Sequence, residues 1–272
     1  MLRRRNQSPR VVSSFCASLL LTLPACRQQE TPTAEYVTTA VPLFQSAIAE
    51  GMPPPRATTM QVMGALGRGD IATARQLTDR RMGDAPPDAE TLFTEGMVLV
   101  AVSSFSAART VFEDCIRAGP SCQGSERAFY FLGVSLTRLG EAEAAHQALD
   151  AYLTLRPEAG IGHSARGDVV LQEGDPAGAL AHFDRALGCF ALDAQRGRAD
   201  AGAIAVAHLG RTDALMQLDR HQDALHAVLA SLEADPRQAD AWYKLSRIQA
   251  ELGHERESAE AFRQFATLNV GG

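Results

Sequence analysis

A small residue returns at nearly constant spacing through most of this 272-residue chain. The positions are Ala74, Ala108, Ala145, Ala179, Ala224 and Ser258, which we call the small-residue ladder. Successive gaps are 34, 37, 34, 45 and 34 residues, so three gaps are equal and the other two are that period with residues added. A period of this length is typical of arrays in which each repeat is a pair of antiparallel helices. The ladder therefore predicts an all-α fold.

Glycine and proline mark the ends of the predicted helices. A glycine stands five residues before most ladder positions, at Gly69, Gly140, Gly174 and Gly253. Glycine takes the left-handed conformation that ends a helix at little cost, so it is expected to close the first helix of each pair. A proline stands twelve residues after most ladder positions, at Pro86, Pro120, Pro157 and Pro236. Proline lacks an amide hydrogen and clashes with the preceding turn, so it is expected to end the second helix.

Alignment on the ladder divides the chain into repeats. Residues 1–26 are a leader, residues 27–54 a tether with an N-terminal helix, and residues 55–272 six repeats. The repeats are 55–88, 89–122, 126–159, 160–193, 205–238 and 239–272. The eleven residues between the fourth and fifth repeats contain no proline, so they are expected to extend a helix or to form a bulging loop. One helix pair cannot bury its own apolar face, which predicts stacking into a solenoid.

The repeats resemble tetratricopeptide (TPR) repeats. The third repeat is the best match, and it carries the family residues Phe129, Leu132, Gly133, Gly140, Ala145, Tyr152 and Pro157. The sixth follows with Trp242, Leu245, Gly253, Ser258 and Phe262. The resemblance implies a right-handed superhelix of antiparallel helix pairs, in which the first helix of each pair lines a concave face that binds a peptide or helix of another protein.

Transfer of the family's inward positions predicts a partner groove. Its residues are Met63, Phe93, Met97, Tyr130, Val134, Asp168, Asp213, Tyr243 and Arg247. The expected groove is apolar toward the N-terminus, where methionine and aromatic side chains suit an amphipathic partner. Toward the C-terminus it is polar and acidic. The lysines and asparagines of the family's carboxylate clamp are missing, so recognition of a terminal carboxylate is not expected. Alternatively, several of these side chains belong to the core between helices.

The first 26 residues have the pattern of an export signal. Arg3, Arg4, Arg5 and Arg10 precede an apolar run of fifteen residues, which is too short to span a bilayer comfortably. Leu23-Pro24-Ala25-Cys26 resembles a bacterial lipobox, which implies lipidation of Cys26 and a membrane-anchored, extracytoplasmic lipoprotein, at the outer membrane if the host has one. Pro24 departs from the usual small residue. An ordinary signal peptide or an uncleaved anchor therefore stays open.

Charge argues against a nucleic-acid partner. The chain has a formal net charge of −6, and residues 1–26 hold four arginines and no carboxylate, which leaves −10 for the rest. A phosphate backbone is bound by clustered lysine and arginine, whereas this body is acidic. No nucleic-acid binding is expected.

Motifs for catalysis, metals and cofactors are not found. The sequence has no phosphate-binding loop, dinucleotide fingerprint or zinc-protease helix. We therefore predict no catalytic residues, no metal site and no cofactor. Cys115 and Cys122 flank Pro120, and an oxidising compartment would permit a disulfide between them. Cys115 occupies a position where the family has a small buried residue, so a buried thiol is the alternative.

These patterns together favour a binding protein over an enzyme. The prediction is a membrane-tethered TPR scaffold that mediates protein–protein interaction in envelope, pilus or secretion assembly, as in the TPR pilotins of type IV pili that it resembles in architecture. The alternative is a periplasmic secretion or assembly chaperone that holds an apolar client with its N-terminal methionine and aromatic side chains. An enzyme is the least favoured interpretation. The oligomeric state, the partner and the envelope system are not determined by the sequence.

Overall fold

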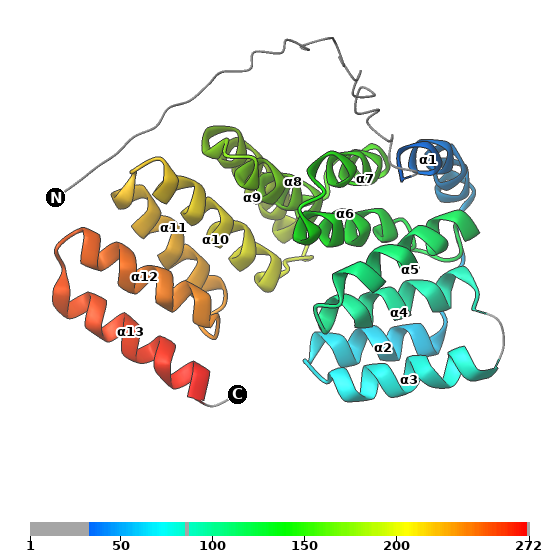
Figure 1. Cartoon of the computed structure of the whole chain (residues 1–272), viewed down its shortest axis with the longest axis horizontal. Coiled ribbons are helices and arrows are strands. Elements are labelled where there is room, and N and C mark those ends of the chain that lie inside the picture. Colours follow the sequence, from blue (N-terminus) through cyan, green and yellow to red (C-terminus); the bar gives the residue numbers. More distant parts are fainter. Residues whose placement is uncertain (1–32, 85–86, 271–272) are drawn as a thin grey trace, which may run out of the picture. The chain divides into compact units, whose positions relative to one another are not determined.

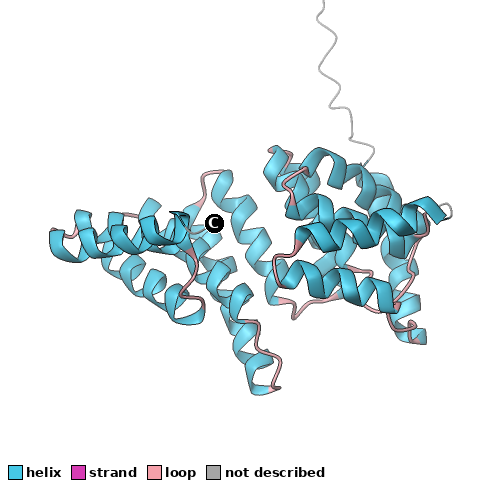
Figure 2. Ribbon diagram, turned by 90° about the horizontal axis from the view of Figure 1, so that it is seen from below, coloured by secondary structure: helices cyan, strands magenta, loops and turns pink. Residues whose placement is uncertain are grey.

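Helices and short loops make up the part of the chain that the computed structural model describes, residues 33–84 and 87–270 (Figures 1 and 2). Thirteen helices are present there, and all belong to one compact unit that begins at Pro32. They are α1 (Thr33–Glu50), α2 (Ala57–Gly67), α3 (Ile71–Asp84), α4 (Ala89–Ala101), α5 (Phe105–Ala118), α6 (Arg127–Leu139), α7 (Ala142–Leu155), α8 (Gly160–Gln172), α9 (Pro176–Gln195), α10 (Ala201–Gln217), α11 (His221–Ala234), α12 (Ala239–Glu251) and α13 (Glu255–Val270).

After α1, the helices pair in chain order. The helices pack in pairs α2/α3, α4/α5, α6/α7, α8/α9, α10/α11 and α12/α13, and each pair also packs against the next. We call α2, α4, α6, α8, α10 and α12 the first helices and their partners the second helices. Each pair covers the apolar face of its neighbour, so the core runs from pair to pair as a solenoid. The all-α fold predicted from the ladder is confirmed.

The ladder residues lie where first and second helices pack against each other. Ala74, Ala108, Ala145, Ala179 and Ala224 on the second helices are fully buried. Four residues after the ladder, a larger side chain fills the space beside a glycine of the first helix. A Cβ added at Gly133 would lie 2.6 Å from Leu149, and one at Gly167 would lie 2.8 Å from the Phe183 ring. The ladder is therefore a packing requirement of each pair.

The turn between the two helices of a pair is left-handed in every pair. Gly69, Gly140, Gly174 and Gly253 have φ between 74° and 84°. In the two pairs without this glycine, Ser103 (φ 58°) and Asp219 (φ 57°) take the same conformation. Non-glycine residues enter this region at a cost because their Cβ crowds the backbone. The turn geometry is kept even where the sequence does not favour it.

The added residues between the fourth and fifth pairs lengthen helices. α9 continues through Ala191 to Gln195, and α10 begins at Ala201, so only five residues separate the two helices. Asp200 caps α10 by accepting a hydrogen bond from the Ala203 amide at 3.0 Å. α9 and α10 consequently have 20 and 17 residues, against 13 or 14 in the helices of the second and third pairs.

α1 packs on the second helices α5 and α7, although α2/α3 follows it in sequence. Phe44 is fully buried, and its ring meets that of Phe129 edge to face at 5.1 Å between centroids. Pro42 lies inside the helix, which begins nine residues earlier. The loop after α1 is held by the three-residue addition before α6, where the amide of Gln123 donates to the carbonyl of Pro53 at 2.8 Å.

Candidate functional site

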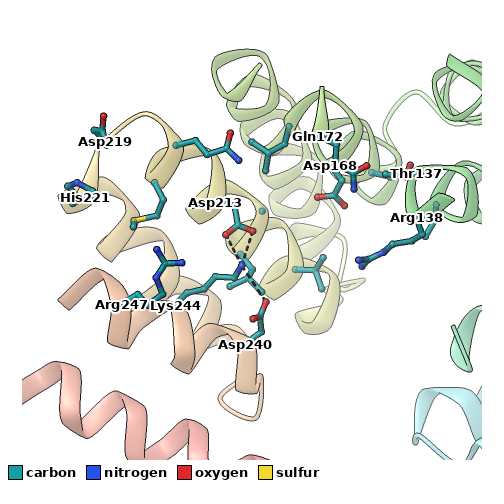
Figure 3. Close-up of a pocket in the computed structure, with 18 of the residues that line it drawn as sticks. Thr137, Arg138, Asp168, Gln172, Asp213, Asp219, His221, Asp240, Lys244 and Arg247 are labelled. Carbon is teal, nitrogen blue, oxygen red and sulfur yellow. Dashed lines mark hydrogen bonds and ion pairs between the residues drawn. The ribbon is translucent and has the colours of Figure 1, made fainter. Parts of the chain in front are cut away.

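A cavity opens between first helices of four consecutive pairs, α6, α8, α10 and α12 (Figure 3). We call it the first-helix cavity, and its volume is about 760 Å³, within the range typical of ligand sites. It is lined by Val134, Thr137, Arg138, Ala165, Asp168, Leu171, Gln172, Val206, Leu209, Gly210, Asp213, Met216, Gln217, Asp219, His221, Asp240, Lys244, Arg247 and Glu251.

The side chains on the cavity wall follow a helical stripe. Four residues of the wall each stand eleven residues before a ladder residue: Val134, Asp168, Asp213 and Arg247. The position at seven residues adds Arg138, Gln172, Gln217 and Glu251, and that at fourteen residues adds Ala165, Gly210 and Lys244. Spacings of three and four residues lie on one helix face, so the four first helices present the same face to the cavity.

Small and apolar residues line part of the wall. Ala165 and Gly210 occupy the fourteen-residue position on α8 and α10. Ala165 contributes one methyl group, and the Phe183 ring occupies the space where a Cβ of Gly210 would lie. Val134, Leu209 and Val206 add apolar surface, and Val206 is 49% exposed. Such a wall offers contact area to apolar side chains of a bound segment.

Lys244 joins two acidic residues in the cavity. Its Nζ lies 2.7 and 2.9 Å from the two carboxylate oxygens of Asp213 on α10, and 3.4 Å from Oδ2 of Asp240 on its own helix (Figure 3). Burial raises the pKa of Asp213, and the hydrogen bond from Lys244 acts in the opposite direction. Lys244 is the only lysine of the chain. This pair ties α10 to α12 across the cavity.

Asp168 differs from the other acidic residues of the wall. It lies on α8, half-buried, and it has no hydrogen bond or ion pair within residues 33–84 and 87–270. Burial raises the pKa of its carboxyl to about 6, with Arg138 lowering it and Asp213 raising it further. Arg138 extends from α6 toward the same part of the cavity (Figure 3). The ionised form of Asp168 is thus poorly stabilised, because burial limits its hydration and it has no ion-pair partner among the described residues.

At the far rim, the charges compensate one another. His221 Nδ1 lies 3.0 Å from Oε2 of Glu251, and Arg247 Nη2 lies 3.6 Å from Oε1 of the same residue. Asp219, in the left-handed turn before α11, is exposed. Across the whole wall, five carboxylates face three cationic side chains, so the cavity is acidic when His221 is neutral.

The structure brings together four of the residues that the sequence assigned to a groove. Val134, Asp168, Asp213 and Arg247 line the cavity, each from a different first helix. Met63 and Met97 hold the same repeat position on α2 and α4, where they are half-buried, and Met97 packs against the core. They lie outside the cavity.

Phe93, Tyr130 and Tyr243, fifteen residues before the ladder, lie outside the cavity as well. Phe93 is 3% exposed, and its ring is 6.4 Å from that of Phe112 and 6.0 Å from that of Phe131. Assigning Phe93 to a groove is therefore corrected: it belongs to the core between helices. Tyr130 packs on Phe131, with ring centroids 5.0 Å apart, and Tyr243 packs on Phe265 of α13 at 5.3 Å.

Sequence reasoning missed Arg138, Lys244 and the glutamines of the wall. It used the positions eleven and fifteen residues before the ladder, which are four residues apart. The wall instead continues to fourteen and seven residues before the ladder, the next steps of the same helical stripe. Residues three before and four after each position that lies eleven residues before the ladder would have included them.

Cys115 and Cys122 are both buried free thiols, so no disulfide joins them in this structure. Sγ of Cys115 donates to the carbonyl of Ala89 at 3.2 Å, which places this thiol against the first helix of its own pair. Burial raises the pKa of Cys115 to about 12. Cys26 and the rest of the predicted leader lie outside the described residues.

Two further features concern the described residues only. Their His, Cys, Asp and Glu side chains form no cluster of three or more that could hold a metal ion. None of their helices combines the length and the apolar character that crossing a bilayer requires.

Comparison with known families agrees with the repeat geometry. Residues 93–159, 132–195 and 209–269 match the profile described as Tetratricopeptide repeat, and these matches cover more than half of the chain. The chain belongs to the tetratricopeptide repeat family. The cavity is thus lined by the first helices of TPR pairs. A search of curated proteins gives no match.

Solved TPR structures share this fold at low sequence identity. A chain of the APC/C hetero-tetramer Cut9–Hcn1 superposes with a TM-score of 0.68 and 14% identity over 88% of this chain, which spans 45% of that longer one. PilF of Pseudomonas aeruginosa gives 0.55 and 19% over 79% of this chain and 92% of pilF. A thermophilic TPR protein of Thermus thermophilus gives 0.57 and 17% over 71% of this chain and 97% of its own. At these identities the likeness concerns the fold alone.

Proposed function

We propose that this TPR protein is a membrane-tethered, extracytoplasmic scaffold that binds a segment of a partner protein in the first-helix cavity. One observation carries the proposal. Four consecutive first helices present the same stripe to a cavity of about 760 Å³, with small and apolar residues beside partly unsatisfied charge. TPR proteins bind peptides or other proteins in a groove of this kind. A wall with both apolar and charged side chains suits an amphipathic segment better than one that is wholly apolar or wholly charged.

The position of α1 supports the tethered arrangement. Thr33, where α1 begins, lies seven residues after Cys26, so the intervening chain spans at most about 25 Å. α1 packs on the second helices α5 and α7 and, through Phe44, on Phe129 of α6, and none of its residues lines the cavity. A lipid anchor at Cys26 would therefore precede a helix that leaves the cavity free.

The envelope system is part of the proposal. We favour assembly of an envelope, pilus or secretion complex, and the fold likeness to pilF is compatible with a pilus role. The chaperone alternative relied on apolar side chains of the N-terminal pairs. Phe93 is enclosed by other rings and Met97 packs against the core, so these residues offer little free surface to a client.

Site-specific photo-crosslinking tests the binding surface. A photoreactive phenylalanine analogue at Val206, which is 49% exposed on the cavity wall, should form a defined adduct with one partner in the native cells. The matched control is the same analogue at Leu229, which is 45% exposed on the second helix α11 and lies outside the cavity. Adducts from Leu229 but none from Val206 would contradict the proposed surface.

The tether needs a separate test. Metabolic labelling with an alkyne-tagged fatty acid should mark the wild type, and Cys26→Ala should abolish the label and move the protein to the soluble fraction. Labelling that persists in Cys26→Ala, or an unlabelled wild type, would remove the anchor from the proposal and leave the cavity unaffected.

A further inference from the structure

The cavity holds one half-buried carboxylate that the fold leaves available. Asp213 and Asp240 share Lys244, and Glu251 lies beside His221 and Arg247. Asp168 alone among the half-buried acids of the wall has no hydrogen-bond or ion-pair partner in the described part of the chain.

We propose that Asp168 determines the specificity of the cavity by pairing with an arginine or lysine side chain of the bound segment. The inference rests on the proposed function, because it requires that the cavity binds a protein segment. It goes further by naming the chemistry of that segment: a basic residue flanked by apolar ones.

Charge complementarity supports a basic occupant over an acidic one. Five carboxylates and three cations line the wall, so the field in the cavity attracts a cation when His221 is neutral. The charged groups that influence the pKa of Asp168 come from three other helices: Arg138 on α6, Asp213 on α10 and Lys244 on α12. Lys244 is already engaged by Asp213, and Arg138 is exposed and forms no ion pair among the described residues. Neither cation forms an ion pair with the Asp168 carboxylate, so a basic side chain of the bound segment can pair with it.

The neighbourhood of Asp168 specifies what flanks the basic residue. Ala165, one turn earlier on α8, and Gly210 on α10 line the same cavity as the carboxylate. Val134 and Leu209 add apolar surface to that cavity. A cation held there would be partly removed from water, which strengthens a charge-assisted hydrogen bond to Asp168. Burial raises the pKa of Asp168, and a cationic partner would lower that pKa and stabilise the ionised form.

A random twelve-residue peptide library displayed on phage provides the probe. Selection against the full-length protein purified in detergent should enrich sequences with one arginine or lysine between apolar residues. Synthetic peptides from the selection would then be titrated by fluorescence anisotropy. We expect Asp168→Asn to weaken binding about tenfold or more, the loss typical of one charge-assisted hydrogen bond. Glu233→Gln removes the same charge from the exposed face of α11 and should leave affinity within about twofold.

Two further measurements separate direct pairing from a structural effect. Replacing the basic residue of the peptide by glutamine should weaken binding to the wild type as much as Asp168→Asn does, and combining both changes should add little, as a double-mutant cycle requires. The melting temperature of Asp168→Asn at pH 7 should equal or exceed that of the wild type, because the substitution removes an unsatisfied carboxylate. A lower melting temperature with additive binding losses would overturn the pairing.

The outcomes distinguish this inference from the function on which it rests. Val206→Trp should block the cavity and abolish binding, whereas Leu229→Trp should not. Selected peptides could lack a basic residue, bind Asp168→Asn as well as the wild type, and fail to bind Val206→Trp. That result would overturn the role of Asp168 and leave the cavity as a binding site. Selected peptides that bind Val206→Trp as well as the wild type would overturn the proposed site itself.

Discussion

The N-terminal and C-terminal first helices carry the same stripe of positions but use it differently. Fourteen residues before the ladder, α4 and α6 have Thr94 and Phe131, whereas α8 and α10 have Ala165 and Gly210. Thr94 is 1% exposed, and the Phe131 ring stacks on Phe112 with centroids 5.5 Å apart. In α8 and α10 the residues at this position, Ala165 and Gly210, line the cavity. The same repeated position thus belongs to a filled interface in one region and to a candidate binding site in the other.

Phe93→Ala gives the largest expected effect in the N-terminal region. Its ring packs among those of Phe112 and Phe131, so truncation removes a buried aromatic side chain and leaves a cavity. We expect the free energy of unfolding to fall by about 3–4 kcal/mol in a urea titration. Tyr243→Ala is the matched control, because Tyr243 holds the same repeat position on α12 but is 40% exposed. Equal losses in the two variants would contradict the difference between the regions.

Gly210→Ala tests whether the small residue of the C-terminal stripe is a packing requirement. A Cβ there would lie 2.4 Å from the Phe183 ring, and a Cβ at Gly167 would meet the same ring at 2.8 Å. Because both first helices press on it, the ring has little room to move. We expect a loss of about 1–3 kcal/mol in unfolding free energy. Gly188→Ala, with no atom within 4 Å, should instead gain up to about 1 kcal/mol from helix propensity.

Asp168→Asn should stabilise the protein at neutral pH. The pKa of Asp168 is raised to about 6 in the folded state, so between about pH 4 and pH 6 the folded state binds more protons than the unfolded state. The wild type therefore loses stability as the pH rises through this window. After allowing for partial exposure, we expect Asp168→Asn to be about 1–2 kcal/mol more stable at pH 7 and nearly equal to the wild type at about pH 3.5.

Thermal unfolding of both proteins across this pH range measures the difference directly. Glu233→Gln, on the exposed face of α11, should follow the wild-type profile. Arg138→Gln should raise the pKa of Asp168 further, because Arg138 lowers it, and NMR titration of the carboxyl would report the change. A stability difference that does not vary with pH would show that Asp168 is not a destabilising carboxylate.

The sequence predicted the helix pairs because their spacing depends on local rules. Small ladder residues and turn glycines recur at fixed distances, and each has a packing or backbone reason that acts within one pair. The exposure of Phe93 was not predictable in this way. The burial of Phe93 depends on Phe131 of the next pair, and aligning a single repeat on a family pattern does not include that contact. The docking of α1 on α5 and α7 is likewise a contact between segments distant in sequence.

The candidate site illustrates the same limit. Asp168 and Asp213 share one repeat position, and the sequence identified both as inward-facing. It did not show that Lys244 pairs with Asp213 and leaves Asp168 without a partner among the described residues. That difference arises because Lys244 lies three residues before Arg247 on the stripe of α12 and crosses to α10. Partner choice depends on side-chain reach between helices, which repeat spacing does not encode.

Ser103→Gly is the smallest expected effect and extends the comparison to the turns. Ser103 and Asp219 take positive φ where other pairs have glycine, one in the N-terminal region and one at the cavity rim. Glycine removes the Cβ strain, although it adds freedom to the unfolded chain. We expect a net gain of about 0.5–1 kcal/mol in unfolding free energy for Ser103→Gly. Asp219→Gly should gain less, because aspartate tolerates this conformation better than serine. If Asp219→Gly gained more, the turn at the cavity rim would be the more strained of the two.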